Sequence, residues 1–182
     1  GAPIALLGGT TLTEWKPLGE SPSQWTLAQG ILRNAKAGAD LVTTRTFGDF
    51  KLHVEFRYPP GSNSGVYLQG RYEIQVLDSY QNPTYPDGSA GALYKQAPPL
   101  VNASRQPGEW QVYDIVFQAP RFEGEKLVKP GHVTVLHNGV LVQNHTEIEG
   151  TTAWDAAPKY SAHPLKQPLH LQDHGNPVRF RN

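Results

Sequence analysis

The sequence predicts a single all-β domain, an antiparallel β-sandwich spanning residues 1–182. Three observations predict it. Apolar and polar residues alternate over several segments, as in strands that bury one face. The 18 glycines and 16 prolines are spread along the chain, which is typical of many short elements joined by turns. Helical periodicity, internal repeats and a composition shift that would mark a second domain are not evident.

The first strand with strong alternation runs from Phe50 to Tyr58. Every second residue in it is apolar, while Glu55 and Arg57 belong to the opposite, polar set. The stretch from Pro59 to Gly61 ends this strand, because proline lacks the N–H that a sheet ladder needs. Further strands are expected at residues 65–69, 72–78, 110–117, 132–137, 140–143, 169–174 and 178–181.

The connections between these strands are of two kinds. Asn138-Gly139 is a strong signal for a two-residue hairpin. Residues 79–105 are rich in Pro, Gly, Tyr and Asn and form a long predicted loop, and residues 150–166 form a second one. Long loops in a compact domain are more often functional or disordered than idle, and a short helical turn is expected in one of them.

Composition argues against several classes of function. Lys+Arg and Asp+Glu both number 16 and no basic block is present, so nucleic acid is not an expected partner. No apolar run approaches roughly 18 residues, so we expect no membrane insertion. Cysteine is absent. The usual metalloprotease, phosphate-loop and serine-hydrolase motifs are missing, and Asp173 and His174 point to opposite faces of a strand, so we predict neither a metal nor a cofactor.

Polar side chains form rows on several predicted strands. In the last long strand, His170, Gln172 and His174 share one face. One such row alone fits a solvated outer face. Together, however, the rows mix carboxylate, imidazole, guanidinium, amide and phenol groups, which suits the hydroxyls and C–H faces of a sugar if the sheet curves into a groove. The other rows are Glu55/Arg57, Tyr67/Gln69 and Glu73/Gln75, and Asn63 either holds a turn or reaches the ligand.

Several blocks closely resemble the 3-keto-disaccharide hydrolase domain family, from about Leu6 to the C-terminus. They are FGDFKLHVEFRYPPGSNSGVYLQGRYEIQVLDSY, GALYKQAPPLVNASRQPGEWQVYDIVFQAPRF, VTVLHNGVLVQNHTEIEG and LQDHGNPVRFRN. The resemblance implies a concanavalin A-like jelly-roll fold and an enzyme acting on glycosides whose C3 hydroxyl is oxidised to a ketone. It also implies a bacterial periplasmic or extracellular location. Family members often carry Arg where this chain has Gln69, and their closing strand continues beyond the position of Asn182, so we expect a shortened strand here.

For such a substrate the resemblance implies proton abstraction at C2, β-elimination and hydration. Our hypothesis makes Glu73 the base and His174 the acid or enolate stabiliser, since imidazole titrates near neutrality. Glu55 would fix Arg57 or act as a second acid or base. The expected substrate-binding residues are Arg57, Asn63, Tyr67, Gln69, Gln75, Gln172 and His170.

Two other classes of function remain open. The first is a non-catalytic carbohydrate-binding module, because the same fold serves sugar binders without activity. The second is an ordinary glucanase-type glycoside hydrolase, which needs two catalytic carboxylates. The alternating partner of Glu73 is Gln75 rather than an acid, which counts against this second alternative.

Overall fold

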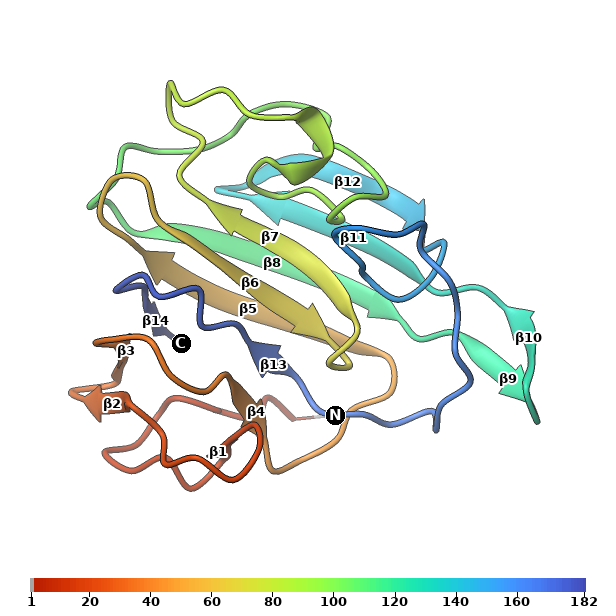
Figure 1. Ribbon diagram of the computed structural model, residues 1–182, viewed down its shortest axis with the longest axis horizontal. Coiled ribbons are helices and arrows are strands. Elements are labelled where there is room, and N and C mark those ends of the chain that lie inside the picture. Colours follow the sequence, from red (N-terminus) through yellow and green to blue (C-terminus); the bar gives the residue numbers. More distant parts are fainter. Residues whose placement is uncertain (1) are drawn as a thin grey trace.

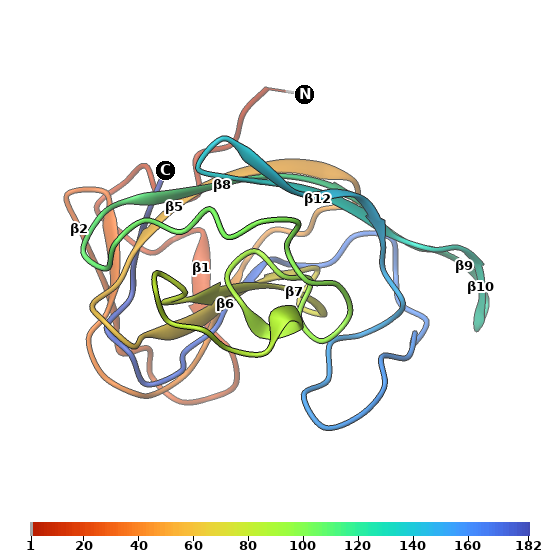
Figure 2. The same ribbon diagram turned by 90° about the horizontal axis from the view of Figure 1, so that it is seen from above.

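The computed structural model describes residues 2–182 and shows two antiparallel β-sheets packed face to face (Figures 1 and 2). Among these residues the only helix is the three-residue 3-10 turn η1, Pro86–Gly88, inside the long loop predicted at 79–105. The predicted all-β antiparallel sandwich is therefore confirmed. Within residues 2–182, no helix has the length and hydropathy needed to cross a membrane.

One sheet has five strands and the other has seven. The order in the five-stranded sheet is β1 (Trp15–Pro17), β4 (Leu41–Thr43), β13 (His170–Leu171), β6 (Asn63–Leu68) and β7 (Tyr72–Leu77). The order in the seven-stranded sheet is β12 (Val140–Glu147), β11 (His132–His137), β8 (Gln111–Gln118), β5 (Phe50–Arg57), β14 (Arg179–Arg181), β3 (Ile31–Asn34) and β2 (Trp25–Ala28). A separate hairpin of β9 (Arg121–Glu123) and β10 (Lys126–Lys129) extends from one end (Figure 1).

The hydrophobic core lies between the two sheets and includes several large aromatic side chains. Phe56, Tyr113 and Phe180 enter it from the seven-stranded sheet, and Tyr72 enters it from β7; all four are essentially inaccessible to solvent. Burial of such side chains is the main favourable contribution to folding, about 2–3 kcal/mol for each. The Tyr113 hydroxyl also crosses the core and donates to the backbone carbonyl oxygen of Gln75 at 2.6 Å, which fixes β7 against the opposite sheet.

Strand boundaries follow the alternation where it is long. β11 spans the predicted 132–137, and β5 ends one residue before the predicted end. The predicted strand at 169–174 is wrong, because only His170–Leu171 pair as β13. Beyond them the Asp173 carboxylate accepts the backbone N–H groups of Gly38 and Gly175, which turns the chain away from the sheet. The strands from β1 to β4 are too short for their alternation to have been recognised.

The first part of the first loop, with η1, and the second loop lie beyond the outer face of the five-stranded sheet (Figure 2), whereas the later part of the first loop runs along the edge of β12, where Leu100 donates its N–H to Val142 O. The first loop pairs its backbone with the free edge of β7, since Gln75 donates to Ala92 and Tyr94 donates to Glu73. The second loop reaches the same strand through Thr152, whose hydroxyl accepts the Glu73 N–H at 2.9 Å. The loops thus cover an edge strand and surround the polar side of β7.

Candidate active site

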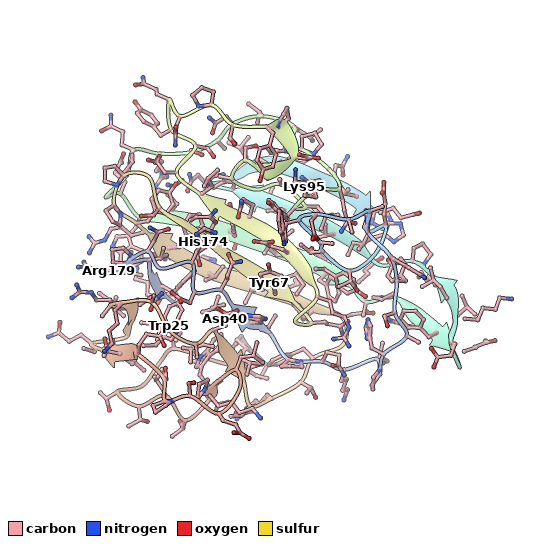
Figure 3. The ribbon with its side chains drawn as sticks, in the orientation of Figure 1. Trp25, Asp40, Tyr67, Lys95, His174 and Arg179 are labelled. Carbon is pink, nitrogen blue, oxygen red and sulfur yellow. The ribbon has the colours of Figure 1, made fainter. Side chains whose placement is uncertain are left out.

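A row of side chains crosses four strands on the outer face of the five-stranded sheet. In the backbone register Glu73 lies opposite Tyr67, Tyr67 lies opposite His170, and His170 lies opposite Val42. Because side chains alternate along a strand, the core positions of Ile74 and Leu171 direct Glu73 and His170 outward. We call Glu73, Tyr67 and His170 the polar row; Figure 3 labels Tyr67 at its centre.

Asp40 fixes one end of the polar row. Its Oδ2 lies 2.6 Å from Nε2 of His170, and its Oδ1 accepts the Asp173 N–H at 2.6 Å. The His170 ring stacks on the Tyr67 ring with centroids 4.8 Å apart. The carboxylate therefore orients the imidazole, and the imidazole holds the phenol ring in place beside Glu73. The sequence offered no signal for Asp40, because it precedes a short strand and lies far from His170 along the chain.

Glu73 is a buried carboxyl group, with 3% of its surface exposed. Burial is the largest cause that raises its pKa, and the negative charge of Asp40 raises it further. The Tyr67 hydroxyl beside the carboxyl lowers the pKa in part, and the result is a pKa of about 7. A pKa near neutrality suits a group that takes up and releases a proton.

Gly65 makes room for the Glu73 carboxyl. This buried residue faces Gln75 across β6 and β7. A Cβ atom at position 65 would collide with Oε1, Cδ and Cγ of Glu73. The carboxyl group thus lies over the bare backbone of β6, where any side chain would displace it.

Two amide side chains on the same face carry oxygen atoms without a protein partner. Gln75 donates its Nε2 to Gly88 O at 3.0 Å, and Gln172 donates its Nε2 to the Tyr67 hydroxyl oxygen at 3.4 Å. Within residues 2–182, the buried Oε1 atoms of both glutamines have no hydrogen-bond donor. A buried acceptor without a donor is costly, so each oxygen needs a donor that the described protein atoms do not supply.

The long loop adds two phenols and one cation around this face. The hydroxyls of Tyr85 and Tyr94 lie 2.7 Å apart, and Lys95 Nζ lies over the Tyr85 ring at 4.0 Å. Burial and the Tyr85 hydroxyl raise the pKa of Tyr94, so it remains a hydrogen-bond donor at neutral pH. Figure 3 shows Lys95 and the exposed His174 over the same sheet as Tyr67. Lys95 is a further residue that sequence reasoning missed.

Glu55 and Arg57 are not part of this face. Both lie on β5, on the outer face of the seven-stranded sheet, so the expectation of one shared polar groove was wrong for them. Glu55 accepts hydrogen bonds from Arg181 at 2.6 Å and Asn182 at 2.9 Å. Burial alone would raise the Glu55 pKa, but these hydrogen bonds outweigh it and hold the pKa below its ordinary value.

Gln69 and Asn63 have mainly structural contacts. The fully buried Gln69 donates its Nε2 to Phe47 O at 2.8 Å and Leu165 O at 2.7 Å, which ties two loops together. Its backbone is left-handed, with φ of 53°, in the turn after β6. Asn63 begins β6, and its N–H donates to Asn176 Oδ1 at 2.9 Å. Of the predicted residues, the structure thus brings together Glu73, Tyr67, His170, Gln75 and Gln172.

A separate cavity lies beside the β9–β10 hairpin. It has a volume of about 500 Å³ and lies between the β9–β10 hairpin and residues 162–165, with Phe122 and His163 among its lining residues. None of its lining residues belongs to the polar row. Among the residues that the structure describes, no three His, Cys, Asp or Glu side chains are placed to hold a metal ion.

Comparison with known proteins identifies relatives that share this fold. A 3-keto-disaccharide hydrolase of Bacteroides thetaiotaomicron is 23% identical over 98% of this chain and 76% of that protein. Two crystal structures of a "putative glycosyl hydrolase" from Parabacteroides distasonis are also similar. The first has a TM-score of 0.91 and 41% identity, and it covers 98% of this chain and 80% of that one. The second has a TM-score of 0.73 and 22% identity, and it covers 97% of this chain and 89% of that one.

The family model described as the 3-keto-alpha-glucoside-1,2-lyase-like domain matches residues 2–182. This match takes in every strand of both sheets, the polar row and the two loops that surround it. The chain therefore belongs to the 3-keto-alpha-glucoside-1,2-lyase-like domain family.

Proposed function

We propose that this protein cleaves glycosides that carry a ketone at C3, by elimination across C1 and C2 followed by addition of water. The family and the name of the Bacteroides relative support the substrate class. The observation that carries the proposal is the buried Glu73 carboxyl, whose pKa of about 7 suits a general base at neutral pH.

The chemistry needs one base and a donor for a developing negative charge. A ketone at C3 acidifies the C2 proton. The Glu73 carboxylate takes this proton, and the electron pair of the C–H bond forms an enolate between C2 and C3. The C1–O bond then breaks, the leaving oxygen takes a proton, and water adds to the resulting enone.

Tyr67 is suited to stabilise the enolate oxygen. Burial is the largest cause that raises its pKa, followed by the nearby Glu73 charge, so the hydroxyl stays protonated at neutral pH. Since Gln172 donates to the Tyr67 oxygen, the hydroxyl hydrogen remains available for the substrate or for Glu73. A donor that faces the atom where charge develops lowers the barrier for such a step.

We assign His174 to the leaving-group side of the substrate. Gln172, two residues before His174, still pairs with β6 and donates its N–H to Gly65 O at 3.0 Å. Three residues, Leu171 to Asp173, lie between His170 and His174 along the chain. Next to the polar row on the same face, Gln75 on β7 and Gln172 flank Gly65 on β6. The two glutamines would orient sugar hydroxyls through their unpaired Oε1 atoms.

The decisive experiment offers the enzyme a 3-keto-disaccharide and its unoxidised parent in deuterated water. We expect cleavage of the keto sugar with deuterium at C2, and no cleavage of the parent, because only the ketone acidifies that proton. Mass spectrometry of the products measures both. Equal cleavage of the parent would contradict the proposal, and saturable binding without turnover would instead support a carbohydrate-binding module.

Substitutions of two residues that affect the Glu73 pKa should shift the pH profile of kcat/KM in opposite directions. We expect kcat/KM to rise with pH through about 7, because the base must be ionised. Asp40→Asn removes a negative charge and should move the midpoint to lower pH. Tyr67→Phe removes the hydroxyl that lowers the Glu73 pKa and should move the midpoint to higher pH.

The matched control for this pair is Asp49→Asn. Asp49 forms an ion pair with Arg121 at 2.8 Å, away from the polar row. Removing the Asp49 charge should therefore leave the midpoint of the kcat/KM profile in place. Profiles of kcat/KM against pH for the four proteins measure this. If both Asp40→Asn and Tyr67→Phe move the midpoint the same way, Glu73 is not the group that titrates.

A further inference from the structure

Three arginines lie side by side on the outer face of the seven-stranded sheet. Arg179 of β14 is opposite Arg33 of β3 on one side and opposite Arg57 of β5 on the other. All three point outward, because the adjacent Leu32, Phe180 and Phe56 are in the core. We call Arg33, Arg179 and Arg57 the arginine row. Figure 3 labels Arg179, near the edge of the molecule.

The arginine row is electrostatically unfavourable by itself. Like charges directly opposite each other in a sheet are destabilising. In the described part of the chain, no carboxylate lies within ion-pair distance of these three guanidinium groups, whereas the neighbouring Arg181 pairs with Glu55 at 2.6 Å. The chain as a whole has a net charge of zero, so this concentration of positive charge is local. A surface that keeps such an arrangement is suited to an anionic ligand.

The geometry indicates which anion fits. Adjacent strands are about 4.8 Å apart, so the backbone positions of the three arginines recur across the sheet at about the length of one sugar residue. Guanidinium groups bind carboxylates through two parallel hydrogen bonds, which gives direction as well as charge. Trp110 orients one end of the row, since its ring lies 4.9 Å from Cζ of Arg57 and 4.0 Å from Cζ of Arg181.

We propose that the arginine row binds an oligosaccharide whose residues carry carboxylate groups, such as a chain of uronic acids. This site lies on the opposite side of the sandwich from Glu73 and does not depend on the proposed reaction. It would hold an acidic glycan while the polar row remains free. Three charged contacts in line would select a linear acidic chain over a neutral one.

Calorimetric titration with a trimer of galacturonic acid tests this, with the fully methyl-esterified trimer as the neutral ligand. We expect the acidic trimer to bind and the ester not to bind. Arg179→Gln should weaken binding about tenfold or more, because it removes the central charged contact. Arg45→Gln is the matched control: it removes the same charge from an exposed arginine that pairs with Glu14, and should leave binding unchanged.

Thermal unfolding without ligand gives an independent readout. Arg179→Gln relieves two like-charge contacts and should raise Tm by roughly 1–3 °C, which also shows that the variant folds. The proposal is overturned if the acidic trimer does not bind, if the ester binds equally well, or if Arg45→Gln weakens binding as much as Arg179→Gln. Binding to phosphatidylserine vesicles in place of the acidic trimer would likewise overturn it.

Discussion

Replacing Glu73 with glutamine is expected to lower turnover of a 3-keto-glycoside by about two to four orders of magnitude. Glutamine keeps the size and hydrogen-bonding ability of the side chain but cannot take the C2 proton. The binding face should remain intact, so KM should change much less than kcat. Steady-state kinetics on the keto substrate measure the two parameters separately.

The same substitution should stabilise the folded protein at alkaline pH. The pKa of Glu73 rises from 4.5 to about 7 on folding, so between these values the folded state binds more protons than the unfolded state. The free energy of unfolding therefore falls as pH rises through this window. The full shift corresponds to a contribution of about 3 kcal/mol to the free energy of unfolding. The wild-type protein loses this contribution by pH 8, whereas Glu73→Gln does not, because it has no carboxyl group at position 73 to ionise.

Thermal unfolding of both proteins between pH 4 and pH 8 checks this. The difference in Tm should grow between pH 4.5 and about 7, to several degrees in favour of Glu73→Gln, and then stay constant. Glu147→Gln is the matched control, because Glu147 is exposed on β12, and it should show neither effect. A Glu73→Gln variant with near-full activity, alongside an inactive Glu55→Gln variant, would move the base to the other sheet.

Alternation along the chain was sufficient to predict the sandwich but not all of its strands. Long segments such as Phe50–Arg57 and His132–His137 show the period clearly, because each side chain meets either core or solvent. Trp15–Pro17 and Leu41–Thr43 are three residues long, so they contain too few alternations to be recognised. Strand β13 stops at Leu171 because contacts of the Asp173 side chain turn the chain, and such long-range contacts leave no local pattern.

The candidate site was predicted only in part, because alternation places residues within a strand but does not place strands within the fold. Alternation shows which side of a strand a residue occupies, and this correctly grouped Glu73 with Gln75 and His170 with Gln172. It cannot show which of the two sheets a strand joins, so Glu55 was placed on the wrong face. It also cannot reveal Asp40, which meets His170 only because β4 and β13 pair across more than a hundred residues.

Gly65→Ala is expected to reduce turnover by about two orders of magnitude although it changes no polar group. Gly65 does not have a positive φ, so alanine can adopt its backbone conformation. The new methyl group would, however, overlap the Glu73 carboxyl and displace it. A shift of about 1 Å in a catalytic group can cost a hundredfold in rate. The added crowding should also destabilise the fold by about 1–3 kcal/mol.

A second substitution separates displacement of Glu73 from general damage to the fold. Glu73→Asp shortens the side chain and makes room for the methyl group, so the double variant should be more stable than Gly65→Ala alone. Gly48→Ala is the matched control, since its Cβ would lie at an ordinary 3.6 Å from Leu165 and should leave kcat unchanged. Equal activity of Gly65→Ala and the wild-type protein would show that the carboxyl is not held where the reaction needs it.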